Sequence, residues 1–208
     1  MLPPEVDEPP TVACRNQDTS VRFCPAVPPK KSLTKDDWLR AAMELLRTRG
    51  VGGVRVLTLA QELRVSRGSF YWHFDDRQYL LDSMLDWWER EMTDTVIQLE
   101  KTGRAGPQRR LLTVAEEILT ANRTRYDPAV RSWAEGDKKA AKVLRRVLRK
   151  RLDFVSGLFE EIGFTPAEAR ARGDLLAVYL MSEWAIHMDE SFDSRLRLVR
   201  RQVRLLSS

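Results

Sequence analysis

The sequence predicts an all-α fold, and three observations support this prediction. Apolar residues recur at helical spacing along most of the chain beyond residue 31. Two segments, TKDD at 34–37 and TPAE at 165–168, have the composition of helix-capping boxes, and the second also places proline at the first helical position. No alternating strand pattern and no Asn-Gly hairpin signal interrupts this succession. We therefore expect a small three-helix head, residues 32 to about 75, followed by a larger helical body.

The N-terminal segment, residues 1–31, contains seven of the ten prolines and few large apolar groups. It cannot bury enough surface to offset the entropy lost on ordering, so we expect a disordered tail. Its two cysteines, Cys14 and Cys24, fit no zinc spacing and are too few for a disulfide scaffold, which favours a reduced, cytoplasmic protein. Its acidic start does not resemble a signal peptide, and the chain has no apolar run of about 18 residues, so no membrane association is expected.

The head is expected to begin with a helix that starts at the Thr34 capping box and ends at Gly50. A second, short helix should pass through Leu59 and Leu63, and a third should follow Ser66. A long amphipathic helix over about 76–100 then connects the head to the body.

The body is expected to contain five further helices. The segment GRAGP, Gly103 to Pro107, separates the connecting helix from the next one. Asp127 is placed to cap a short helix, with Pro128 at its first helical position.

The two longest body helices follow. Asp137 can cap a helix that ends at Ile162, where Gly163 supplies a left-handed stop. One side of this helix is apolar, and eight Lys and Arg residues lie between 138 and 151. TPAE starts the next helix, and an arginine-rich helix over 195–206 is expected to be the last.

The segment LAQELRVSRGSFYWHF, Leu59 to Phe74, carries the functional signal. Two short helices separated by a tight polar turn, with apolar residues where the pair must face each other, predict a helix-turn-helix. Phe70 and Phe74 are four residues apart and should pack in the core, which leaves Tyr71, Trp72 and His73 on the exposed side. The helical spacing leaves two alternatives for Trp72, which are packing against the connecting helix and contact with DNA.

The start of the predicted recognition helix is suited to nucleic acid. Ser66 is placed to cap it by accepting a hydrogen bond from a backbone N–H two or three residues on, with the helix dipole available to a phosphate. Gly68 weakens the helix but lets a DNA backbone approach closely. Residues 31–67 hold eight Lys or Arg against four Asp or Glu, a bias that suits a polyanion.

These residues resemble the DNA-binding domain of the tetracycline-repressor (TetR) family of bacterial regulators. The resemblance spans Lys35 to Trp88 and is carried by VRV at Val54, LAQEL at Leu59, VSRGSFYWHF at Val65 and DRQYLL at Asp76. DPAVRSW from Asp127 and GFTPAEA from Gly163 resemble one subgroup of the family more loosely.

The resemblance implies a homodimeric repressor that binds a palindromic double-stranded DNA operator and is released by a small-molecule inducer. It implies a DNA-binding domain at 32–92, with the helix-turn-helix at about 55–74, and a ligand-binding and dimerisation domain at 93–208. The last two long helices would form a four-helix bundle in the dimer. No cofactor and no metal is implied, and a helical enzyme has little support, since the sequence holds no phosphate loop, metal-ligand spacing or nucleophile motif.

By position, the residues expected to contact DNA are Arg55, Ser66, Arg67, Gly68, Ser69, Tyr71, Trp72, His73 and Arg77. Two of the neighbouring positions depart from the family pattern. Arg55 stands where many members have a threonine, and Arg64 replaces the usual glycine of the turn, which implies a less flexible turn with an added positive charge.

Large body side chains that could line a ligand pocket are Trp87, Trp133, Phe154, Met181, Trp184 and His187. Each of them also suits the core or a dimer interface. As an alternative function, the basic helix 138–162 could bind an acidic protein or a membrane surface.

Overall fold

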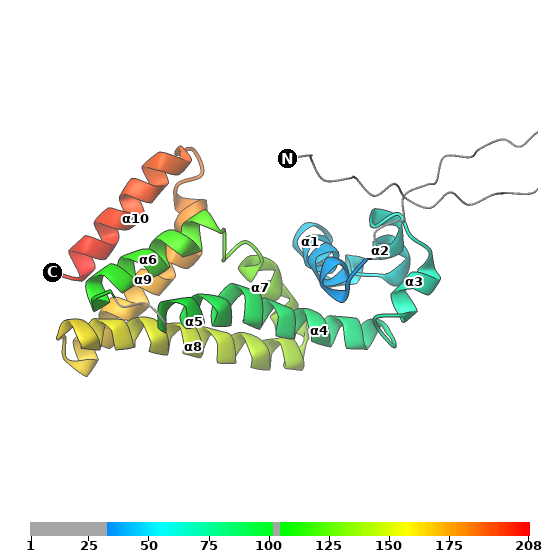
Figure 1. Cartoon of the computed structure of the whole chain (residues 1–208), viewed down its shortest axis with the longest axis horizontal. Coiled ribbons are helices and arrows are strands. Elements are labelled where there is room, and N and C mark those ends of the chain that lie inside the picture. The colour runs from blue at the N-terminus through cyan, green and yellow to red at the C-terminus, as the bar shows by residue number, and fades with distance from the viewer. Residues whose placement is uncertain (1–32, 102–104) are drawn as a thin grey trace, which may run out of the picture. The chain divides into compact units, whose positions relative to one another are not determined.

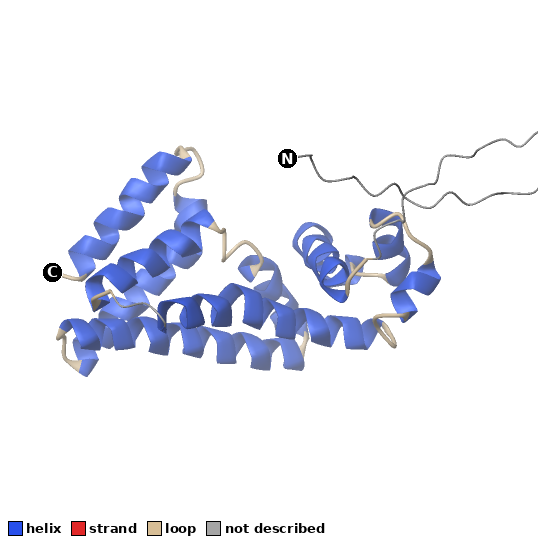
Figure 2. Ribbon diagram, viewed as in Figure 1, coloured by secondary structure: helices blue, strands red, loops and turns tan. Residues whose placement is uncertain are grey.

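The computed structural model describes residues 33–101 and 105–208, and Thr34–Ser208 form one compact unit. Figure 2 shows helices and loops, and no strand, in this part of the chain, so the predicted all-α class is confirmed. The predicted tail, residues 1–31, lies outside the described residues, as do residues 103 and 104 of the predicted interruption.

The head consists of three helices, α1 Lys35–Gly53, α2 Val56–Glu62 and α3 Arg67–Tyr71 (Figure 1). The capping box at the start of α1 is confirmed, because the Thr34 side chain accepts from the backbone N–H of Asp37 and the Asp37 carboxylate accepts from the Thr34 N–H. Gly50 interrupts regular helix as predicted, with a φ of 66°, but a further turn continues to Gly53. Only glycine adopts this backbone conformation without steric cost.

The head core forms around α3. Phe70 and Phe74 are 0% and 1% exposed, and their rings stack with centroids 5.2 Å apart. The rings of Trp38 from α1 and Phe70 pack edge to face, with their centroids 5.6 Å apart, and Leu59 from α2 is fully buried. The assignment of the two phenylalanines to the core is therefore confirmed, and they hold α3 against α1 and α2.

The connecting helix continues through three segments, α4 Arg77–Glu89, the π-helical η1 Arg90–Asp94 and α5 Thr95–Lys101. The π-helical segment was not predicted. In it the backbone N–H of Thr95 and its hydroxyl both reach the carbonyl of Arg90, which accommodates one extra residue in the turn. Figure 1 shows this long helix beside α8, Lys138–Ile162, and Lys150 of α8 donates to Glu89, just before η1, and to Asp94, at the end of η1.

The body contains five further helices in the described residues: α6 Pro107–Thr120, α7 Asp127–Gly136, α8 Lys138–Ile162, α9 Pro166–Ile186 and α10 Phe192–Leu206. The predicted start of α8 at Asp137, its left-handed stop at Gly163 and the capping box of α9 at Thr165 are all confirmed. The last helix starts at Phe192, earlier than the predicted 195, because Ser191 caps it.

The prediction that Asp127 caps α7 is wrong. Tyr126 occupies the N-cap position, and Asp127 is the first helical residue. The Asp127 carboxylate instead accepts hydrogen bonds from Arg151 and from the indole N–H of Trp88, at 2.5 and 3.1 Å. The half-buried Arg151 competes successfully with the helix terminus for a buried carboxylate, since an unpaired charge there is costly.

The body core lies between α6, α8, α9 and α10. Its fully buried members include Leu111, Phe159 and Val199 from three of these helices. Where α8 meets α9, Gly173 allows close approach, because a Cβ at that position would lie 2.5 Å from the Ser156 hydroxyl. The result is a well-packed support for the connecting helix.

Candidate DNA-binding surface and body cavity

The helix-turn-helix is formed by α2, a short turn and α3. Arg64 in the turn has a φ of 55°, the left-handed conformation that glycine normally supplies. The turn thus keeps the left-handed backbone conformation typical of glycine, although Arg64 occupies the position. Ser66 is the N-cap residue of α3, but its side chain accepts no hydrogen bond from the helix, so that detail of the prediction is wrong. The first closing bond is made by backbone, from the Ser69 N–H to the Ser66 carbonyl at 3.1 Å.

One side of α3 is open to solvent. Arg67 and Gly68 are exposed, Tyr71 is 56% exposed, and Trp72 is 87% exposed. The packing alternative for Trp72 is thereby excluded, because a side chain so exposed does not pack against the connecting helix. His73 is only half-buried beside Trp38, with ring centroids 6.3 Å apart. The surface presents a cation, an indole and a phenol next to a backbone that carries no side chain at Gly68, which suits phosphate and base-edge contacts.

Two arginines flank this surface and also hold the chain between α1 and α2. The guanidinium of Arg77 donates to the carbonyls of Val54 and Val51 at 2.7 and 2.8 Å. Arg55 donates through Nε to the Gly52 carbonyl at 3.0 Å. Each guanidinium has five N–H donors, so both retain donors beyond these bonds.

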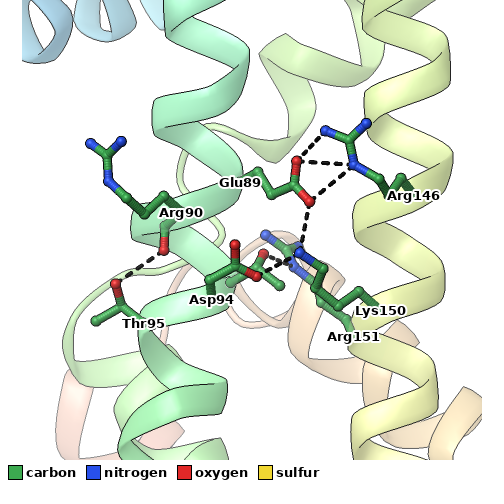
Figure 3. Close-up of polar contacts among 8 residues, drawn as sticks. Glu89, Arg90, Asp94, Thr95, Arg146, Lys150 and Arg151 are labelled. Atoms are coloured by element: carbon green, nitrogen blue, oxygen red, sulfur yellow. Dashed lines mark hydrogen bonds and ion pairs between the residues drawn. The ribbon is translucent and has the colours of Figure 1, made fainter.

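A cluster of ion pairs joins the π-helical segment to α8 (Figure 3). The Glu89 carboxylate accepts hydrogen bonds from Arg146 at 3.1 Å and from Lys150 at 2.7 Å, and Lys150 also reaches Asp94 at 2.7 Å. The bonds from Arg146 outweigh the effect of burial and lower the pKa of Glu89 to about 2. Glu89 is therefore a buried anion near neutral pH, and it ties the connecting helix to the middle of α8.

A second polar group lies one turn away. Arg151 donates to the Thr93 hydroxyl at 2.8 Å as well as to Asp127, which in turn accepts from Trp88. The guanidinium of Arg151 also lies over the Trp88 ring, 5.4 Å from its centroid. Arg151 thus bonds at once to the π-helical segment and to the start of α7.

The start of α7 contacts the head. The hydroxyl of Tyr126 donates to the Glu44 carboxylate of α1 at 2.7 Å, and the indole of Trp87 donates to Asp36 of α1 at 2.6 Å. Burial, reinforced by the bond to Glu44, raises the pKa of Tyr126 to about 12, so the hydroxyl remains a donor near neutral pH. Tyr126, which bonds to α1 of the head, and Asp127, which bonds to Arg151, are therefore consecutive residues.

A cavity of about 380 Å³ lies in the body between η1, α5, α6, α8 and α9. Its walls are mostly aliphatic, and include Val96, Ile118 and Leu152. Thr93 and Arg151 lie in its lining, so an occupant would touch the polar group that joins η1, α7 and α8. Ligand cavities of about 300–1,000 Å³ are typical of small-molecule sites.

The predicted ligand residues separate into two groups. Phe154 and Met181 line this cavity. The other four do not: Trp87 is fully buried against α1, Trp133 is buried in α7, Trp184 is 46% exposed at the end of α9, and His187 lies beside Tyr179.

Arg151, Thr93 and Glu89 were missed from the sequence. Arg151 interrupts the apolar series Val143, Val147, Val155 and Phe159, at the i+4 position after Val147. Glu89 similarly follows Leu81 and Leu85 at i+4 spacing. A charge on an otherwise apolar helix face is the signal that could have identified both.

Comparison with known proteins agrees with the head geometry. A family model described as bacterial regulatory proteins, tetR family, matches residues 39–84. The class A tetracycline repressor protein from transposon 1721 of Escherichia coli is 40% identical over 48 residues, which are 23% of this chain and 22% of that protein. The matched segment therefore spans about a fifth of the length of this relative.

Solved structures match the whole described fold at low sequence identity. A TetR transcriptional regulator from Legionella pneumophila superposes with a TM-score of 0.70 at 14% identity, over 84% of this chain and 97% of that one. A putative transcriptional regulator from Saccharomonospora viridis in complex with choline superposes with a TM-score of 0.67 at 16% identity, over 82% of this chain and 95% of that one. Residues 39–84 therefore match the N-terminal domain of the tetR family of bacterial regulatory proteins, and the described chain shares the fold of these solved regulators.

Proposed function

We propose that this protein is a repressor that binds a palindromic operator as a homodimer and leaves it when a small molecule occupies the body cavity. The DNA-binding part of the proposal is supported by the contrast between the buried and the exposed side of α3. Phe70 is fully buried and fixes the helix, while Arg67, Tyr71 and Trp72 of the same short segment face solvent. Side chains that are exposed on a rigidly held helix are suited to the major groove.

The division into a DNA-binding domain at 32–92 and a ligand-binding and dimerisation domain at 93–208 is part of this proposal. Arg67 is the best candidate for reading a base edge, since arginine bonds guanine bidentately. Ser66, Ser69 and His73 are suited to phosphate contact, as are the remaining donors of Arg55 and Arg77.

The proposal of a dimer is supported by the outward faces of the last two helices. On α9, Leu175, Val178 and Ile186 are 63%, 59% and 62% exposed, although the opposite side of the helix is buried in the core. On α10, Phe192 and Leu205 are 47% and 66% exposed. A helix that is apolar on both sides requires a second partner, and a second copy of α9 and α10 would supply it.

The proposed release mechanism uses the contacts between cavity and head. An occupant that contacts Arg151 and Thr93 acts on the π-helical segment directly, and on the start of α7 through Asp127. The Tyr126 bond to Glu44 carries a shift of α7 to α1. Coupling of about 1–3 kcal/mol between two sites changes DNA affinity about 5- to 150-fold, which is sufficient for release. The choline complex of the Saccharomonospora viridis relative supports a small-molecule ligand for this fold.

The alternative of an acidic partner for the basic helix is less well supported. Of the eight cations between 138 and 151, Lys139, Arg146, Lys150 and Arg151 form ion pairs within the chain. They neutralise the connecting helix and α7 rather than presenting a uniform basic face.

The proposal is tested with Arg67→Ala and Tyr71→Ala in the full chain. Operator DNA, recovered by selection from a random pool, is titrated by fluorescence anisotropy. Each variant should lose about five- to 150-fold in affinity with an unchanged dimer by size-exclusion chromatography, because loss of a base contact costs about 1–3 kcal/mol. The matched control is Arg145→Ala, which removes an exposed arginine of α8 in the body. Unchanged affinity of both head variants would refute the assignment of α3.

The salt dependence supplies an independent check. Phosphate contacts release counterions, so log K should fall steeply and linearly with log salt concentration, with a slope of about −0.9 per phosphate contacted. A flat dependence would contradict the proposed basic surface.

A further inference from the structure

The cavity lining is rich in arginine, and the arginines differ in whether they have an ion-pair partner. Four arginines line a cavity whose walls are otherwise mostly aliphatic. Three of these arginines are ion-paired, Arg123 with Glu117, Arg151 with Asp127, and Arg170 with Asp153 and Asp174. Across the residues that the structure describes, Arg131 forms no ion pair. Arg131, which is exposed to solvent, is therefore the arginine of the lining that has no carboxylate partner and is left to pair with an occupant.

The unpaired charge has a definite place. Arg131 follows Asp127 by one helical turn on α7, and residues four apart share a helix face. Since Asp127 bonds to Arg151 in the lining, Arg131 lies on the side of α7 that faces this group. The hydroxyl-bearing Thr124, just before α7, lies in the same lining. The lining therefore combines the unpaired Arg131 and the Thr124 hydroxyl with apolar side chains such as Val96, Ile97 and Val155.

We propose that the cavity takes an amphipathic ligand with a single negative charge, whose anionic group binds Arg131 and whose apolar body lies against the aliphatic walls. This inference rests on the proposed function, in which the cavity holds the inducer. A cationic ligand would be repelled by Arg131 and would meet Asp174, the acid of the lining, already paired with Arg170. A neutral ligand would gain from the walls but not from Arg131.

The volume limits the size of the ligand. A water-sized group occupies about 30 Å³, so 380 Å³ accommodates roughly a dozen non-hydrogen atoms. A straight-chain carboxylate of about ten carbons has this size and charge, which makes decanoate a suitable probe.

The test compares three probes of equal chain length, decanoate, decanol and decyltrimethylammonium, each below its aggregation concentration. Binding to the purified full chain is measured by isothermal titration calorimetry. Decanoate should bind about tenfold or more tightly than decanol, and the cation should bind most weakly. In Arg131→Gln the preference of decanoate over decanol should disappear, whereas Arg145→Gln, which removes an exposed arginine outside the lining, should retain it.

Each outcome decides the inference. Equal or tighter binding of decanol or the cation would overturn it, as would failure of all three probes to bind, or a preference for decanoate that persists in Arg131→Gln. Operator affinity is measured on the same preparations without probe. A protein that binds its operator but not decanoate contradicts only this inference, whereas one that binds no operator contradicts the proposed function.

Discussion

Replacing Glu89 by glutamine should weaken the junction between the connecting helix and α8 without changing side-chain size. The side chain is 10% exposed, and the change leaves Arg146 and Lys150 without their shared anion. Lowering a carboxyl pKa from 4.5 to about 2 corresponds to about 3 kcal/mol of stabilisation. Arg146 and Lys150 are 48% and 36% exposed, so solvent screens them, and we expect a loss of about 1–2 kcal/mol.

The effect should depend on pH with a definite sign. Because the pKa of Glu89 is lower in the folded than in the unfolded chain, its ionised form stabilises the fold fully above about pH 4.5. This contribution is lost as the pH falls from there towards 2. The difference in unfolding free energy between wild type and Glu89→Gln should therefore be largest at pH 7 and shrink at pH 3.5.

Urea denaturation followed by circular dichroism measures the loss of unfolding free energy in Glu89→Gln and its dependence on pH. The control is Glu91→Gln, since Glu91 lies two residues further along the connecting helix, in η1, but pairs with Arg90, which is 56% exposed. It should cost less than about 0.5 kcal/mol. The reasoning is refuted if Glu89→Gln costs no more than the control, or if its cost is the same at both pH values.

Three further predictions concern the effect of single substitutions on stability. Phe70→Ala should destabilise the head by about 3–5 kcal/mol, whereas Trp72→Ala should change stability by less than about 0.5 kcal/mol and lower operator affinity; thermal unfolding and anisotropy distinguish the two. Gly173→Ala should cost about 1–3 kcal/mol in urea unfolding, because its Cβ would collide with Ser156. Arg77→Ala should destabilise by about 1–3 kcal/mol, as two carbonyls lose their donor, and a stability equal to wild type would contradict this structural role.

Features that depend on a few neighbouring residues were predictable from the sequence. The capping boxes at Thr34 and Thr165 require only residues three apart, and both form. Helical phase alone separated the buried Phe70 from the exposed side of α3. It did not decide between packing and exposure for Trp72, because that depended on whether the connecting helix covers it.

Features that depend on distant residues were not predictable. Asp127 has a local capping signal, but Arg151, 24 residues later, takes its carboxylate. The π-helical segment has no local signature, and the ion pairs of Glu89 and Asp94 with Lys150 fix both of its ends to α8. The cavity is lined mainly by aliphatic side chains, whereas large aromatic residues such as Trp87 fill the core instead.

The central claim is that two copies of α3 read a symmetric DNA site. Selection of DNA by the full chain from a random pool tests it most directly. We expect a two-fold symmetric sequence whose half-sites lie about one helical turn, roughly 10 base pairs, apart. The absence of any enriched sequence, or an enriched site without two-fold symmetry, would contradict the account.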